Sequence, residues 1–204
     1  MDLGIFQETN LNDGIYTCGS AGYIVVATDV PRRHRGVVAV FYQPAPYFSM
    51  EAAQQFGPNV VGFQLATGEQ QWYILGCHLA PNDTSTIESV VTALKERPRG
   101  AELLVAGYFN TKILEPEGDR SGAEIAATLA TEGLKDMSAH FLPLRSSWFW
   151  DGRTWILIRA GREVRFRTDY ILGTDLRLFW NVSFRDPRHN SDHKWFWVAS
   201  AEPP

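Results

Sequence analysis

Cysteine is scarce in this 204-residue chain, and its scarcity excludes two classes of protein. Cys18 and Cys77 are too few for the disulfide framework of a small secreted domain, and they do not have the spacing of paired metal ligands. Cys77 lies within an apolar run, so the simplest prediction is a buried small hydrophobic side chain. Disulfide-stapled and cysteine-zinc proteins are therefore excluded.

Long apolar stretches are also missing. No run approaches the length of a membrane-spanning helix, and the N-terminus lacks the basic region and apolar core of a secretory signal. We therefore expect an intracellular protein, nuclear or cytoplasmic, that is neither secreted nor bound to a membrane. The length fits one substantial domain, which we expect to span residues 1–204.

Positive charge is not in excess overall, because the formal net charge is −4, but the charges are unevenly distributed. The segment from Arg145 to Lys194 contains ten Lys and Arg against six Asp and Glu. Such a segment is either a surface that faces phosphate groups or a set of solvated arginines on hairpin loops. The sequence leaves both interpretations open.

The spacing of apolar residues predicts a mixed α/β fold. Helices are expected over Ile87–Lys95 and Gly122–Thr131, where apolar residues recur at helical spacing before a glycine. A hairpin is expected from Val60–Leu65 and Trp72–Leu79 around a Thr-Gly-Glu turn. Further strands are expected at Leu3–Phe6, Tyr23–Ala27, Val37–Tyr42, Leu103–Ala106, Trp148–Trp150, Thr154–Ile158, Thr168–Leu172, Leu178–Phe184 and Lys194–Ala199.

Polar side chains recur where these apolar runs end. Gly107 is expected to end the strand that begins at Leu103, so that Asn110 emerges at the carboxyl end, where ligands collect in α/β sheets. A junction of this kind is by itself more often a plain turn. The same placement recurs, however, elsewhere in the chain. The other groups are Glu8, His78 with Asn82, Asp169, and Asn190-Ser191-Asp192-His193.

These groups favour phosphate chemistry assisted by a hard metal ion. Carboxylates and amides are oxygen ligands of the kind that Mg²⁺ prefers, and the near absence of cysteine disfavours zinc or thiol chemistry. The adjacent Asp192 and His193 suit a metal ligand beside a proton-transfer or phosphate-polarising group. Taken singly, Glu8 and the Asp-His pair are equally compatible with ordinary surface residues.

Five stretches in order resemble the endonuclease/exonuclease/phosphatase superfamily, most closely the apurinic-type endonuclease domain that precedes the reverse transcriptase of non-LTR retrotransposons. The stretches are Phe6–Thr9, Gly76–Pro81, Ala106–Asn110, Thr168–Leu172 and Asn190–His193. The resemblance implies an α/β (α+β) fold, a four-layer sandwich of two mixed β-sheets flanked by helices, and a DNA endonuclease activity. The sequence leaves open whether a longer parent chain carries a reverse transcriptase domain as a partner.

The resemblance also implies a role for each matched position. Glu8 would ligate Mg²⁺ or Mn²⁺ with help from Asp192, and Asp192 would orient His193 to stabilise charge on the phosphorane. His78 would contact the scissile phosphate, and Asn110 would orient the attacking water or the phosphate. Asp169 would support the hydrogen bonds of the site and the partner imidazole. Substrate-binding roles are expected for Asn82, Arg167 and Ser191.

The chain departs from the family pattern at two places. The family motif is Gly-Asp-Phe-Asn, whereas this chain has Gly107-Tyr108-Phe109-Asn110. The missing aspartate is the family's candidate for activating or positioning the nucleophile. Loss of a general base costs on the order of 10²–10⁴ in rate. The family's first strand and the helix after it are absent, so we expect an N-terminally truncated domain. A catalytically impaired remnant that retains nucleic-acid or partner binding is therefore the alternative to an active endonuclease, and a phosphatase acting on a small or lipid phosphate is a third, less supported possibility.

Overall fold

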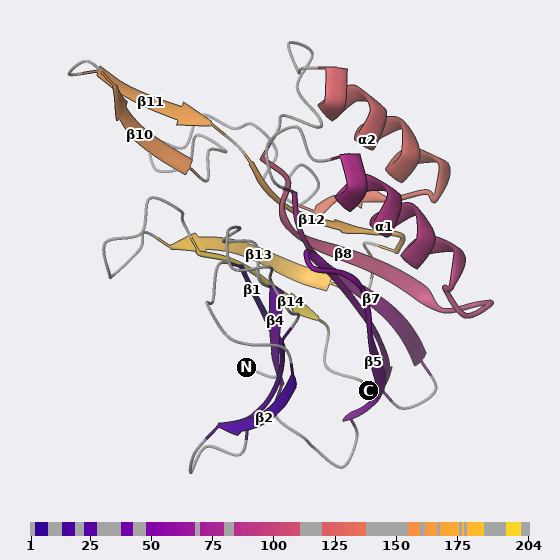
Figure 1. The fold of residues 1–204 in the computed structure, drawn as a ribbon. Coiled ribbons are helices and arrows are strands. Elements are labelled where there is room, and N and C mark those ends of the chain that lie inside the picture. The colour runs from indigo at the N-terminus through magenta and orange to yellow at the C-terminus, as the bar shows by residue number, and fades with distance from the viewer. Residues whose placement is uncertain are drawn as a thin grey trace. The chain divides into compact units, whose positions relative to one another are not determined.

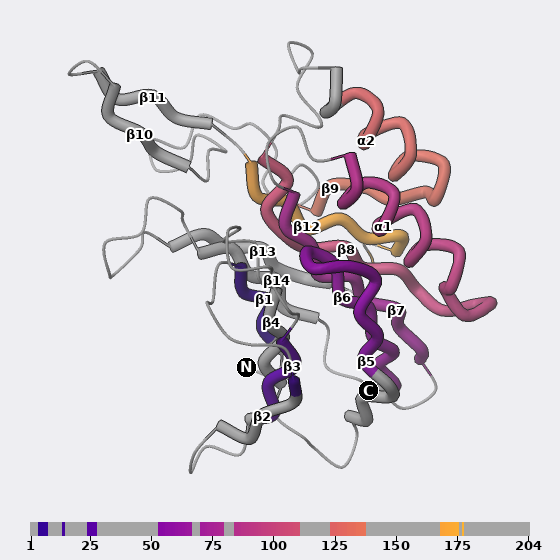
Figure 2. Tube along the Cα trace, in the orientation of Figure 1, coloured from indigo at the N-terminus to yellow at the C-terminus, as the bar shows by residue number. Residues whose placement is uncertain are grey.

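The structure is a computed structural model, and the residues that it describes include most of the elements expected from the sequence. It falls into two compact units, Met1–Tyr108 and Phe109–Pro204. The coloured part of the tube in Figure 2 lies within the described residues. The described residues are 3–7, 14–18, 23–27, 38–42, 48–67, 70–79, 84–110, 120–137, 155–159, 162–166, 168–175, 177, 179–185 and 195–200.

The first unit opens with an antiparallel four-stranded sheet (Figure 1). Its strands are β1 (Leu3–Gln7), β2 (Gly14–Cys18), β3 (Tyr23–Ala27) and β4 (Val38–Tyr42), in the order β1-β4-β3-β2. β3 is a run of apolar and β-branched residues, and Val25, Val26 and Ala27 are buried. β1 and β4 contact β6, β7 and β8, so the two sheets of this unit pack face to face.

The second sheet of this unit carries the strands that lead to the candidate site. It contains β5 (Phe48–Gly57), β6 (Val60–Thr67), β7 (Gln70–His78) and β8 (Glu102–Tyr108), in that order. β5, β6 and β7 are antiparallel neighbours, whereas β7 and β8 are parallel and are separated in sequence by α1 (Thr84–Lys95). Such a crossover brings the carboxyl ends of two parallel strands side by side.

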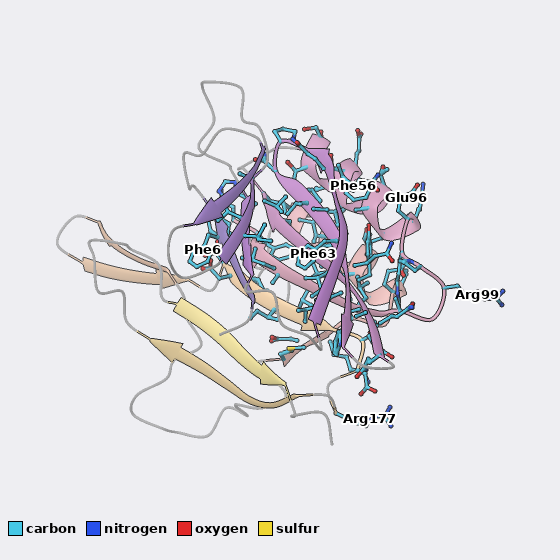
Figure 3. The ribbon with its side chains drawn as sticks, turned by 90° about the horizontal axis from the view of Figure 1, so that it is seen from below. Phe6, Phe56, Phe63, Glu96, Arg99 and Arg177 are labelled. Atoms are coloured by element: carbon cyan, nitrogen blue, oxygen red, sulfur yellow. The ribbon has the colours of Figure 1, made fainter. Side chains whose placement is uncertain are left out.

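Helix α1 covers one face of this sheet, and its contacts reach β5, β6 and β7 (Figure 1). The helix forms because Val90, Ala93 and Leu94 recur at helical spacing, and all three are buried. β7 lies between the helix and the first sheet, and for this reason it is an almost continuous apolar run with every residue from Trp72 onward buried. Phe63 of β6 lies among these strands (Figure 3).

The second unit contains one helix and three antiparallel strand pairs among the described residues. Helix α2 (Arg120–Thr131) buries Ile125 and Leu129. Gly133, with a φ of 72°, follows the helix; its N–H donates to the carbonyl oxygen of Ala130, and the N–H of Leu134 donates to that of Leu129. The pairs are β12 (Asp169–Gly173) with β9 (Lys135–Asp136), β10 (Trp155–Arg159) with β11 (Arg162–Phe166), and β13 (Phe179–Arg185) with β14 (Trp195–Ser200).

Most of the expected elements are confirmed, and four strands were missed. The hairpin, both helices and the strands over residues 3–6, 23–27 and 103–106 are present, with ends that differ by a few residues. The prediction missed β2, β5, β9 and β11. β5 was missed because its sequence is rich in polar residues, with Gln54 and Gln55 exposed on this edge strand of the sheet. The strand expected at Trp148–Trp150 lies outside the described residues.

Two expectations on extent stay predictions, namely a single domain over residues 1–204 and an N-terminal truncation. Neither described helix is long and apolar enough to cross a membrane.

Candidate functional site

The strand that carries the central motif runs further than the sequence predicts. Gly107 does not end the strand, because Gly107 and Tyr108 both belong to β8, where they pair with Cys77 and His78 of β7. A Cβ atom at Gly107 would lie 1.8 Å from the carbonyl oxygen of Cys77. The glycine is therefore required by the close approach of two backbones, not by a turn.

Cys77, beside this contact, is a structural residue as the sequence predicts. Its side chain is fully buried, and its Sγ lies 3.8 Å from the carbonyl oxygen of Ala106. Burial raises the pKa of the Cys77 thiol to about 12. A thiol that stays protonated in this way is not a nucleophile at neutral pH.

His78 and Tyr108 lie opposite each other at the carboxyl ends of β7 and β8, and we call them the ring pair. Their ring centroids are 5.2 Å apart, with an angle of 45° between the ring planes. His78 is 5% exposed, whereas Tyr108 is half-buried. The structure therefore places the predicted phosphate-contacting histidine beside Tyr108, which stands where the motif of the resembled family has aspartate.

Two backbone hydrogen bonds hold the ring pair in place. The backbone N–H of His78 donates to the carbonyl oxygen of Asn59 at 2.9 Å, and that of Leu79 donates to the carbonyl oxygen of Tyr108 at 2.8 Å. Asn59 is itself buried, and its Nδ2 donates to the Thr86 hydroxyl of α1 at 3.2 Å. Sequence reasoning missed Asn59, whose only local signal is a polar residue next to a proline between two strands.

In the second unit, Asn110, Thr168 and Asp169 form what we call the polar corner. The backbone N–H of Phe109 donates to the carbonyl oxygen of Thr168 at 2.8 Å. The buried ring of Phe109 packs edge-on against Tyr170, with centroids 5.7 Å apart. Asn110 and Asp169 each lie one residue from this hydrogen bond, so the structure brings these two predicted site residues into one region.

Backbone geometry suits the residue types of the polar corner. Asn110 has a φ of 51°, a left-handed conformation that asparagine tolerates better than most residues. The hydroxyl of the buried Thr168 donates to Oδ2 of the half-buried Asp169 at 3.3 Å. Asp169 therefore presents a carboxylate that is oriented by its neighbour, and Asn110 presents an amide from a tight bend.

The remaining predicted site residues are Glu8, Asn82, Arg167, Ser191, Asp192 and His193, and all lie outside the described residues. Within the described ranges, no three His, Cys, Asp or Glu side chains gather as metal ligands do. Among the predicted site residues that the structure describes, the Asp169 carboxylate and the Asn110 amide oxygen are the hard oxygen ligands that fit Mg²⁺.

Comparison with solved structures identifies the fold. The endonuclease domain of TRAS1, a telomere-specific non-LTR retrotransposon, superimposes with a TM-score of 0.71 and 19% identity, covering 100% of this chain and 87% of that one. An endonuclease/exonuclease/phosphatase family protein from Leptotrichia buccalis gives a TM-score of 0.66 and 15% identity over 98% and 88% of the two chains. The chain has the endonuclease/exonuclease/phosphatase fold. The fold class and the resemblance predicted from the sequence are thereby confirmed.

A third similar structure is a DNA complex. The 3' phosphatase NExo from Neisseria, bound to a product DNA hairpin, gives a TM-score of 0.70 and 16% identity over 98% of this chain and 89% of that one. No family model and no curated protein sequence matches the chain. At these identities the likeness concerns the fold alone, and function must be argued from the side chains.

Proposed function

We propose that the chain is a metal-dependent phosphodiesterase that nicks DNA, of the type found in non-LTR retrotransposons. The observation that supports this proposal most is the polar corner, where a carboxylate and an amide lie together in a chain with the endonuclease/exonuclease/phosphatase fold. Both groups are suited to orienting a water molecule and a phosphate oxygen. The DNA-bound structure with this fold also supports a nucleic-acid substrate.

In the proposed reaction, Asn110 donates from its amide to the phosphate or holds the attacking water in line. Asp169 accepts a hydrogen bond from the partner imidazole, which we assign to His193, and holds it facing the phosphate. His193 then donates to the phosphoryl oxygen on which charge develops. These assignments follow the order of the motifs along the sequence and the described geometry at Asn110 and Asp169.

Glu8 and Asp192 would hold Mg²⁺ or Mn²⁺, and the bound ion would offset negative charge on the phosphate. His78 would contact the phosphate from β7, and because it is only 5% exposed, this contact requires the residues that cover it to move. Asn82, Arg167 and Ser191 would bind the substrate backbone. The basic segment from Arg145 to Lys194 would supply further phosphate contacts.

Tyr108 supports a second candidate function, a catalytically impaired domain that still binds nucleic acid. The tyrosine takes the position of the family aspartate and its ring packs on His78. A tyrosine has an ordinary pKa near ~10, so a neutral hydroxyl replaces a carboxylate that would accept a proton. For the active endonuclease and for the impaired domain alike, the proposal includes a longer parent chain with a reverse transcriptase domain.

Nicking of supercoiled plasmid in Mg²⁺ tests the proposal, with this chain compared with Tyr108→Asp. We expect slow nicking by the unchanged chain and faster nicking by Tyr108→Asp, by about 10²–10⁴ if the carboxylate restores a general base. Nicking by Tyr108→Asp alone would favour the impaired domain. Absence of nicking by both proteins, with circular dichroism showing that both are folded, would refute the proposed activity.

A further inference from the structure

The ring pair belongs to the rigid part of the first unit. Gly107 brings the two strands so close that a single added carbon would overlap the Cys77 carbonyl oxygen. Backbone hydrogen bonds at His78 and Leu79, of 2.9 and 2.8 Å, fix the ends of both strands. Tyr108 is therefore presented by paired backbone, with little conformational freedom left to lose when a ligand binds.

His78 and Tyr108 differ in exposure, and this difference indicates that they have different roles. His78 is almost fully buried and lies against the Tyr108 ring, with centroids 5.2 Å apart. Tyr108 is half-buried, so part of this residue remains accessible at the carboxyl end of β8. An accessible aromatic ring on a fixed backbone is a surface on which another planar ring can stack.

The chemistry of Tyr108 is unlike that of the residue it replaces. A carboxylate repels phosphate unless a cation lies between them, whereas a tyrosine ring has no net charge and interacts through its face. Nucleobases are the planar groups that a nucleic acid presents, and every base has such a face. In a duplex these faces are stacked on neighbouring pairs, and freeing one costs a few kcal/mol.

From these observations we infer that Tyr108, supported by His78, stacks an unpaired nucleobase, so that the chain binds single-stranded DNA in preference to duplex DNA. The inference rests on the proposed function for the class of ligand, but it does not require hydrolysis or a metal ion. It assigns to the altered motif position a binding role in place of the lost proton transfer.

Fluorescence anisotropy with a labelled pyrimidine 12-mer, in the presence of a chelator, tests this binding without turnover. Loss of one stacked base weakens binding by about 5- to 150-fold, and we expect Tyr108→Leu to raise Kd within that range. Tyr108→Phe keeps the ring and is expected to retain the affinity. The same 12-mer annealed to its complement is expected to bind more weakly than the single strand.

Phe56 offers a matched control. It is also a half-buried aromatic residue of the first unit, but it lies on β5, which β6 and β7 separate from β8 (Figure 3). Three strand spacings amount to roughly 14 Å, beyond the reach of a base stacked on Tyr108. Phe56→Leu is therefore expected to leave the Kd unchanged, and an equal loss in both leucine variants would overturn the assignment to Tyr108.

A second ligand keeps the inference testable even if Tyr108→Leu does not fold. An abasic 12-mer carries the same phosphates but no bases, so the unchanged chain should bind it more weakly than the pyrimidine 12-mer. Equal affinity for the two strands would overturn the inference, as would an unchanged Kd in a Tyr108→Leu variant with the thermal melt of the parent. Because these measurements need no cleavage, a chain that binds but never nicks would refute only the proposed activity.

Discussion

The ring pair and the polar corner differ in which chemical groups they present. The ring pair presents a neutral aromatic residue, Tyr108, whose ring lies against the buried imidazole of His78. The polar corner presents a carboxylate and an amide, at Asp169 and Asn110, as the resemblance to the family implies. The polar corner therefore matches the family pattern that the sequence resembles, whereas position 108 departs from that pattern.

The backbone requirements are met in both regions. Gly107 permits the close approach of two strands, and Asn110 adopts a left-handed conformation. These two residues determine the local backbone geometry independently of the side chain at position 108. Residues that set the backbone geometry and a residue expected to perform chemistry have different roles at such a site, so the two roles must be tested separately.

The largest effect is expected from Gly107→Ala, which tests the backbone requirement at the ring pair. The added Cβ would lie 1.8 Å from the Cys77 carbonyl oxygen, so β7 and β8 must separate. We expect the free energy of unfolding to fall by about 4 kcal/mol or more. Urea unfolding followed by circular dichroism measures the loss.

Gly100→Ala is the matched control for Gly107→Ala. Gly100 has a φ of 85°, and a Cβ there would meet nothing within 4 Å. Its alanine variant should lose only the cost of a left-handed residue, about 1–2 kcal/mol. Equal losses at the two glycines would contradict the role assigned to the close approach.

The next effect concerns the chemistry of the polar corner and is measured as activity. Asp169→Asn keeps the size of the side chain but removes the negative charge that we assign to orienting an imidazole. In the Tyr108→Asp background, we expect plasmid nicking to slow by about 10²–10³ with little change in stability. Glu124→Gln, at an exposed position of α2, is the control and should nick at the unchanged rate. Equal rates for the two variants would remove Asp169 from the site.

Two substitutions at Asn110 separate its backbone role from its side-chain role. Asn110→Ala must place an alanine at a φ of 51°, and we expect a loss of about 1–2 kcal/mol in unfolding free energy. Asn110→Gly tolerates this conformation and should be close to the parent in stability. Both lose the amide, so both should lose nicking in the Tyr108→Asp background. An Asn110→Gly variant that nicks normally would show that the residue only shapes the bend.

The elements that could be predicted from the sequence are those whose burial leaves a local pattern. β7 is apolar from Trp72 to Cys77 because it is covered on both faces, and α1 shows its core positions at Val90 and Leu94. β5 could not be predicted in the same way, because polar residues such as Gln54 are exposed on it. The β5 strand exists through its pairing with β6, which is a property of two segments.

The same distinction holds for the candidate site. Asn110 and Asp169 were predicted as site residues because each lies where an apolar run ends, and their roles stay predictions. Gly107 was wrongly expected to end β8. Its neighbour Cys77 comes from another strand, and the contact between them depends on the register of β7 against β8. Asn59 was missed for the same reason, since its partners, His78 and Thr86, lie in later elements.

The smallest effect is expected at Asp175, which forms an ion pair with Arg177 in the second unit and is not part of the polar corner. Hydrogen bonds from the Arg177 side chain, at 2.7 and 2.9 Å, and then from its backbone N–H lower the pKa of Asp175 to about 2. The Arg177 side chain is 90% exposed and projects outward (Figure 3), so solvent screens the pair and Asp175→Asn should cost only about 0.2–1 kcal/mol.

The pH dependence of that cost identifies its origin. Because the folded pKa of Asp175 lies below its ordinary value of 3.8, the stabilisation is fully present above that value and is lost as the pH falls toward about 2. Urea unfolding of the parent and of Asp175→Asn should therefore differ more at pH 6 than at pH 3, and added salt should reduce the difference at pH 6. A difference that stays constant with pH and salt would show that the aspartate acts through the shape of the turn, not through its charge.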